Sequence, residues 1–218
     1  SFNTYGQGIY MDWSSNCPAA GFVDISTTGT DLQLVYGGEA ALTLPFPILY
    51  QGELVNDCTI GNNGGMALGT TTAQIAGGGN FNTLAGNVIF PWGDLLDEET
   101  GNVYHETIGT APNRTFIVQW DSICNYVGSV TSPTVTFQVQ FDEATHHFWF
   151  VYDDVVFGAP NAADDYGANA DIGVSGPNQD IAVSVNDGTY LQNNSCVEFY
   201  YTDCPKPRNI LTTFLGPD

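Results

Sequence analysis

Residues 134–153 read TVTFQVQFDEATHHFWFVYD, and this stretch decides the fold class. Between Val135 and Phe141 every second residue is apolar, so the apolar side chains would share one face of a strand and the threonines and glutamines the other. Residues 142–145 then form a short polar loop, and 146–153 return as an aromatic strand. Because this return run is apolar on both faces, we predict an antiparallel hairpin with a covered, central second strand.

Short runs of this kind recur along the chain. Glycine and proline, at 25 and 11 residues, punctuate the sequence, and no long stretch has the spacing of an amphipathic helix. Further strands are predicted at 22–26, 32–36, 40–44, 57–61, 87–91, 102–107, 115–120, 171–175, 180–185 and 195–202. The sequence therefore predicts an all-β fold, a two-sheet antiparallel β-sandwich of jelly-roll-like form with long loops.

The charge balance excludes several classes of partner. The chain has 3 Lys and Arg residues against 24 Asp and Glu, a formal net charge of −21. Binding to nucleic acid needs clustered basic side chains, so we expect no nucleic-acid partner. The apolar runs are too short to span a bilayer, so no membrane insertion is expected either. Strong self-repulsion also favours a saline or calcium-containing environment, where charges are screened.

The cysteines indicate an oxidising compartment. They stand at 17, 58, 124, 196 and 204 without a Cys-x-x-Cys pair, which favours one or two disulfides over zinc or redox chemistry. If 22–26 and 195–202 are antiparallel neighbours, Cys17 and Cys204 come together, and we predict that pair. The alternative is a set of buried free thiols in a cytosolic protein.

Several segments together resemble a known group of modules. They are FVDISTTGTDL (22–32), LPFPILYQG (44–52), IGNNGGMALG (60–69), IFPWGDL (89–95), PNRTFIVQW (112–120) and TFQVQF (136–141). In order and spacing they resemble secreted β-sandwich modules of Bacteroidetes cell-surface and extracellular proteins, with a pattern related to a nidogen-like domain. The resemblance implies a secreted or cell-surface adhesion or ligand-binding module, often in proteins with a type IX secretion tail. The chain departs from the group at Gly93, where an acid often precedes Asp94.

The end of the chain has a different character. Residues 204–210, CPKPRNI, resemble the start of a fibronectin type III module. We therefore predict a sandwich module over 1–203, with an irregular segment at 1–20, and a linker or the start of a following module over 204–218. Since the chain begins at Ser1 without Met, we expect mature or excised material from a longer protein.

Three side chains stand out as candidates for binding or for structure. Trp92 and Trp13 fall outside regular strand patterns, and planar rings at a surface could stack on sugar. The alternative is a tryptophan that caps the end of the sandwich. Arg114 precedes a predicted strand and is the only basic side chain before residue 206, so we expect a structural pairing with a carboxylate or carbonyl.

Two acidic loops are candidate calcium sites. The first contains Asp94 and Asp97, with Glu98 and Glu99, and the second contains Asp153, Asp154, Asp164 and Asp165, with Asp171 nearby. Calcium takes six to eight oxygen ligands, which irregular acidic loops can supply. The favoured set is Asp153, Asp154, Asp164 and Asp165, and the alternative is solvated loops on an acidic surface.

The sequence favours a non-catalytic secreted or cell-surface module for adhesion or extracellular assembly. Its expected partner is a glycan or another surface protein, and exposed β edges would allow self-association into filaments. One alternative is a carbohydrate-binding module of a secreted hydrolase. A third is a glycan-acting enzyme that uses a pair of carboxylates, since 24 acids offer many pairs.

Overall fold

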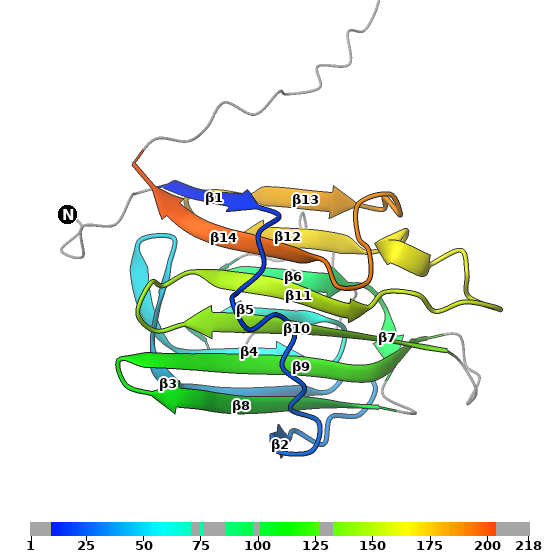
Figure 1. The fold of residues 1–218 in the computed structure, drawn as a ribbon, viewed down its shortest axis with the longest axis horizontal. Helices are drawn as coiled ribbons and strands as arrows, with labels where there is room; N and C mark the ends of the chain where they lie inside the picture. The colour runs from blue at the N-terminus through cyan, green and yellow to red at the C-terminus, as the bar shows by residue number, and fades with distance from the viewer. Residues whose placement is uncertain (1–9, 71–74, 76–85, 98–100, 127–132, 204–218) are drawn as a thin grey trace, which may run out of the picture.

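A computed structural model describes residues 10–70, 75, 86–97, 101–126 and 133–203. Over these residues the chain forms two antiparallel sheets that pack face to face (Figure 1). The prediction of an all-β sandwich is therefore confirmed. Within the described part of the chain, no helix is long and apolar enough to cross a membrane.

The larger sheet has the order β1-β14-β11-β10-β9-β8-β2, with β7 paired to β9 beside this path. Its strands are β1 (Tyr10–Ser14), β2 (Thr30–Asp31), β7 (Leu96–Asp97), β8 (Asn102–Thr110), β9 (Asn113–Asn125), β10 (Thr134–Asp142), β11 (Phe148–Asp154) and β14 (Cys196–Thr202). The smaller sheet has the order β13-β12-β6-β5-β4-β3. Its strands are β3 (Glu39–Tyr50), β4 (Glu53–Gly61), β5 (Gly65–Leu68), β6 (Val88–Gly93), β12 (Asp171–Ser175) and β13 (Ile181–Val185).

The predicted hairpin is the centre of the larger sheet. Strands β10 and β11 pair in antiparallel register, with Val139 opposite Phe150, and β11 lies between β10 and β14. The alternating residues of β10 point into the core as expected, and Phe137 is fully buried. Residues 148–152 of β11 are covered on both faces, which explains why all five are apolar or aromatic.

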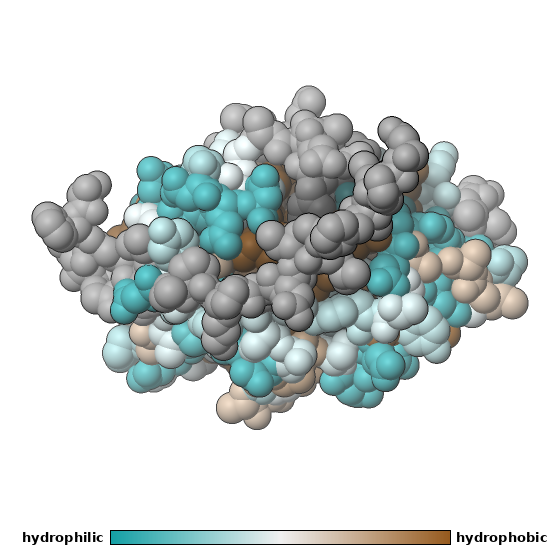
Figure 2. Space-filling view, turned by 90° about the horizontal axis from the view of Figure 1, so that it is seen from above, coloured by the Kyte–Doolittle hydropathy of each residue, from teal (hydrophilic) through white to brown (hydrophobic). Residues whose placement is uncertain are grey.

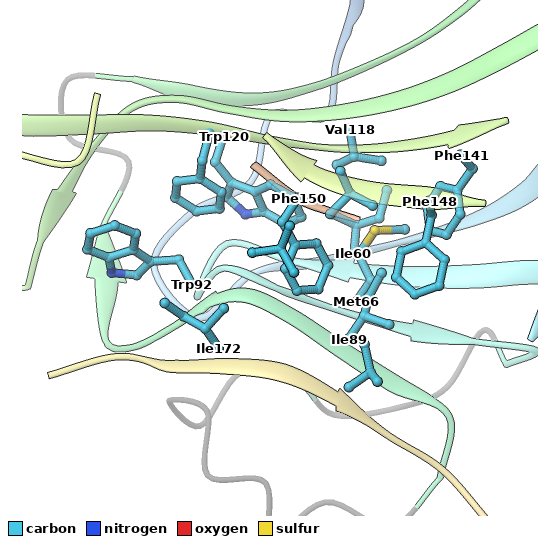
Figure 3. Close-up of a cluster of buried hydrophobic side chains, with 14 of the residues drawn as sticks. Ile60, Met66, Ile89, Trp92, Val118, Trp120, Phe141, Phe148, Phe150 and Ile172 are labelled. Carbon is cyan, nitrogen blue, oxygen red and sulfur yellow. The ribbon is translucent and has the colours of Figure 1, made fainter. Parts of the chain in front are cut away.

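An aromatic core fills the space between the sheets (Figure 3). The ring of Phe137 stacks on Trp120 with the centroids 5.2 Å apart and on Trp92 at 5.8 Å. Two buried polar atoms tie the sheets together, since Trp120 Nε1 donates to the Gly61 carbonyl at 2.9 Å and the Tyr152 hydroxyl to the Pro91 carbonyl at 2.7 Å. Each fully buried ring contributes about 1.5–3 kcal/mol to folding.

A segment that we call the strap, residues 15–29, crosses the outer face of the larger sheet between β1 and β2 (Figure 1). Glutamines on that face hold its backbone. The Gln119 Oε1 accepts the Ile25 amide at 2.9 Å, and Gln138 Nε2 donates to the Val23 carbonyl at 2.5 Å. Two predictions are corrected here: 22–26 is part of the strap rather than a strand, and the supposedly irregular 1–20 contains β1.

A disulfide anchors the start of the strap to β14. It joins Cys17 to Cys196, so the predicted Cys17–Cys204 pair is wrong. The reason is the register: β14 pairs with β1 rather than with 22–26, and Ser14 lies opposite Glu198. Continued by three residues, that register places Cys17 opposite Ser195, next to Cys196. Cys204 and the predicted linker 204–218 lie outside the described residues.

Two further cysteines, Cys58 and Cys124, are buried and lie outside this disulfide. Burial raises the pKa of the Cys58 thiol to about 12, with a smaller effect from Asp57. A protonated, enclosed thiol is unreactive, so Cys58 acts as a small apolar core residue.

Candidate functional site

The two tryptophans predicted to bind sugar lie in different surroundings. Trp92 is fully buried in the core (Figure 3). Its ring stacks on Phe137 and meets Phe157 edge-on, with its centroid 5.8 Å from each of theirs. It cannot offer its ring to a ligand at the surface, so its predicted role is wrong. Trp13 lies half-buried on β1 with its ring edge-on to Tyr190 at 5.5 Å. The two rings therefore form no common platform.

The favoured calcium ligands have different partners. Asp153 lies near Asp154 and Asp24, whose charges add to the effect of burial in raising the pKa of Asp153. Asp164 instead accepts a hydrogen bond from Asn125 Nδ2 at 2.9 Å. Asp165 Oδ1 accepts a hydrogen bond from the Gly158 amide at 2.8 Å. Among the described residues, no group of three or more His, Cys, Asp or Glu side chains is arranged to hold a metal ion.

Asp94 belongs to a different acidic group from the one predicted. Its pKa is raised to about 6, chiefly by burial and to a smaller extent by the charges of Asp164 and Asp171, while a hydrogen bond from the Leu95 amide opposes these effects. The loop that carries Asp94 and the loop that carries Asp164 therefore meet in the fold. Asp97 is half-buried on β7. Glu98 and Glu99 lie outside the described residues, and calcium binding stays a prediction.

Arg114 makes a bidentate ion pair with Glu143. The distances are 2.8 Å from Nε to Oε2 and 2.6 Å from Nη2 to Oε1. The pair fixes the loop between β10 and β11 against the start of β9, since the Glu143 amide also donates to the Arg114 carbonyl at 2.9 Å. The guanidinium lies over the ring of Phe46, 5.2 Å from its centroid. Arg114 therefore has a carboxylate partner, as the sequence predicts.

One end of the sandwich is organised by the glycine-asparagine turn between β4 and β5. Asn62 and Asn63 are buried there; Asn62 Nδ2 donates to the Leu96 carbonyl at 3.3 Å, and Asn63 Oδ1 accepts the Leu96 amide at 3.2 Å. Gly64 has φ +72° and lies against the Trp92 carbonyl, where a Cβ would come within 1.8 Å. Only glycine fits this turn. It holds β7 and the loop before it in place.

Loops at this end carry an exposed apolar group that we call the tyrosine patch: Val35, Tyr36, Leu95 and Tyr126. The rings of Tyr36 and Tyr126 stack with centroids 4.3 Å apart, yet Tyr36 keeps 46% of its surface exposed and Tyr126 keeps 45%. The Tyr126 amide donates to the Leu95 carbonyl at 2.9 Å, and Val35, next to Tyr36, is 68% exposed.

The patch gathers a large share of the exposed apolar surface. Of the eight large hydrophobic residues that are exposed in the described part of the chain, four belong to it. Seen from above the view of Figure 1, hydrophobic residues appear in a central area and in smaller areas at the right and lower edges, among hydrophilic ones (Figure 2). Exposed apolar groups concentrated in this way are typical of interaction sites.

Acidic residues border the patch. Asp94 directly precedes Leu95, and Asp164 is bound to Asn125, the neighbour of Tyr126. An aromatic centre with a charged border is the usual anatomy of a protein–protein interface. Sequence reasoning missed the patch because Tyr36 and Tyr126 stand 90 positions apart. Tyr36 ends the predicted strand 32–36, whereas Tyr126 lies outside every predicted strand. Their only local signal is a large apolar residue beside a turn.

A family model described as "NIDO related" matches residues 15–209, which is most of the chain. No curated protein and no solved structure matched.

Proposed function

This chain belongs to the NIDO-related family, and from that premise we propose that it is a secreted or cell-surface module for adhesion or extracellular assembly. Family membership and the Cys17–Cys196 disulfide indicate an extracellular protein. The proposed module binds a protein partner through the tyrosine patch and catalyses no reaction.

The stacked Tyr36–Tyr126 pair is the observation that carries this proposal. Tyrosine supplies a large contact area with little loss of side-chain entropy, and such residues dominate the energetics of interfaces. Stacking fixes both rings before a partner arrives, which lowers the ordering cost of binding. The buried Asn62 and Asn63 hold the neighbouring loops still in the same way.

The surrounding charge specifies the kind of partner. With a net charge of −21 and acids at the border of the patch, the complementary surface is apolar at its centre and rich in Lys and Arg at its rim. A second copy of this chain lacks such a rim. We therefore expect a different protein, and association that weakens as salt is added.

The test is retention of surface proteins from the source cells on the immobilised module. We expect proteins that the wild-type module retains to be lost with the variant Tyr36→Ser/Tyr126→Ser. Tyr10→Ser, which removes a comparably exposed tyrosine from the edge strand β1, should retain them. Equal retention by wild type and the double variant would contradict the proposal. So would a sedimentation experiment in which the wild-type module alone forms dimers and the double variant does not.

A further inference from the structure

A second, separate feature is a cavity between the strap and the larger sheet. Its volume is about 390 Å³, within the range of small-molecule sites of roughly 300–1,000 Å³. Strap residues from Pro18 to Val23 line one side, and residues of β8, β9, β10 and β11 line the other. It involves Thr115, near the start of β9, whereas the tyrosine patch lies beyond the other end of that strand.

The strap makes this cavity a fixed feature of the fold. The disulfide at Cys17 anchors the segment on one side, and Gln140 Nε2 donates to the Gly21 carbonyl at 2.9 Å on the other. The loop after β10 is fixed as well, because Asp142 Oδ1 accepts the amide of Thr145 at 2.8 Å and its hydroxyl at 2.7 Å. A site assembled in advance loses little entropy when a ligand enters.

The lining combines two kinds of surface. The apolar part comes from the Trp149 ring and from small aliphatic side chains of the strap and Ile108. The polar part comes from hydroxyl, amide, carboxylate and imidazole groups, and contains neither Lys nor Arg. The polar lining residues are Thr115, Gln140, Asp142, Thr145 and His147.

Two lining groups define the hydrogen bonds that a ligand would make. The Trp149 Nε1 is buried and has no hydrogen-bond partner among the described residues, and such a donor is costly to leave unpaired. The His147 Nδ1 lies 3.0 Å from Glu198 Oε1, so Nε2 is the ring nitrogen left to meet a ligand. The site therefore offers both donors and acceptors beside an aromatic ring.

We propose that this cavity binds a neutral carbohydrate, with one sugar ring against Trp149. A pyranose has an apolar face of C–H groups, which suits the indole, and a rim of hydroxyls that both donate and accept. Hydroxyls donate to the Asp142 carboxylate, and the His147 ring nitrogen that Glu198 leaves open is a second polar partner. Acidic sugars are disfavoured, because the lining carries a carboxylate and the whole chain a charge of −21.

The test is a glycan array of neutral gluco-, manno- and galacto-configured oligosaccharides beside sialylated and sulfated ones. The best neutral oligosaccharide is then titrated by calorimetry into the wild-type protein and three variants. These are Trp149→Ala, Thr145→Ala, which removes one hydroxyl at the rim, and the control Trp13→Ala, a partly buried tryptophan of the same sheet outside the cavity. Thermal melting establishes that each variant is folded.

We expect neutral glycans to bind, with the affinity reduced about tenfold or more by Trp149→Ala, a loss of about 1.4 kcal/mol. Thr145→Ala should reduce it less, and Trp13→Ala should leave it unchanged. The Tyr36→Ser/Tyr126→Ser variant should bind sugar normally, which separates this site from the tyrosine patch. Binding only of acidic glycans, binding of none, or equal binding by wild type and Trp149→Ala would overturn the proposal. If Trp149→Ala does not fold, two other measurements decide. The proposal is then overturned if Thr145→Ala binds the sugar with unchanged affinity and if the sugar does not protect the Trp149 indole N–H in NMR.

Discussion

Asp94 carries the clearest titration behaviour of any single residue here. Its pKa in the folded protein is about 6, above the ordinary value of 3.8, chiefly because the carboxyl is buried and then because Asp164 and Asp171 are near. The folded state thus holds this proton more tightly than the unfolded chain. The stability that this group contributes is present below about pH 4 and is lost as the pH rises through 6.

We therefore predict that Asp94→Asn stabilises the protein at pH 7 by about 1–3 kcal/mol and changes little at pH 4. Asparagine can still accept the Leu95 amide, so the loop is preserved. Urea denaturation across this pH range measures the difference. Asp203→Asn, at an exposed position, is the control. A variant that is less stable at pH 7, or equally shifted at both pH values, would show that burial does not govern this carboxyl.

The sequence contains a pattern that indicates burial of Trp92, but the residues beside Trp92 favour a surface turn. Pro91 and Gly93 beside it, with an acidic loop following, are typical of a surface turn. Yet residues 88–92 are apolar without alternation, which is typical of a strand covered on both faces, and β6 is such a strand. The tyrosine pair had no equivalent signal, since contact between residues 90 positions apart depends on how the loops meet.

At the scale of elements, alternation located β10 and its hairpin but did not indicate what covers them. The glutamines of β10 were expected on a polar outer face, and they do point outward. Gln138 and Gln140 are nevertheless buried, because the strap lies over them. The alternation of apolar and polar residues distinguishes the two faces of a strand. It is the same whether the polar face meets water or a second backbone segment, so the sequence of β10 does not predict the strap. In the strap itself, the apolar residues Val23 and Ile25 alternate with polar ones, and this pattern predicted a strand where the chain is an irregular covering segment.

We predict that Gln138→Leu loosens the strap. The change removes the partners of the Val23 backbone and of the Gln119 and Gln140 side chains, with a cost of about 2–4 kcal/mol for buried groups left unpaired. Hydrogen exchange should accelerate at the Val23 and Ile25 amides before global unfolding. Gln192→Leu, which alters an exposed glutamine, should leave both rates unchanged. Unaltered protection of these amides in Gln138→Leu would mean that the strap is held by other contacts.

At the scale of the molecule, the disulfide closes nearly the whole chain. Cys17 and Cys196 are 179 positions apart, so the cross-link restricts the unfolded state strongly. The chain-entropy relation gives about 5 kcal/mol of stabilisation. We predict this loss for Cys17→Ser/Cys196→Ser in urea denaturation. Reduced wild-type protein should match the variant, because both lack the Cys17–Cys196 cross-link. Equal stability of oxidised and reduced protein, or a peptide map joining Cys17 elsewhere, would contradict the assignment.

The net charge of −21 is the other property that belongs to the whole molecule. Within the described residues Arg114 is the only Lys or Arg, so most carboxylates lie among other carboxylates and repel in the compact state more than in the expanded chain. The Debye length falls from about 30 Å at 0.01 M salt to about 3 Å at 1 M, which removes most of that repulsion. We predict that the melting temperature rises over this range by several degrees.

Sodium chloride and choline chloride should act equally, because screening depends on ionic strength rather than on the cation. Calcium chloride at matched ionic strength separates screening from binding. A larger rise with calcium, reduced in Asp94→Asn or in Asp153→Asn, would place a bound ion in one of the two acidic groups. Melting that is independent of sodium chloride would refute the view that self-repulsion limits stability, and with it the expectation that this protein works in a saline environment.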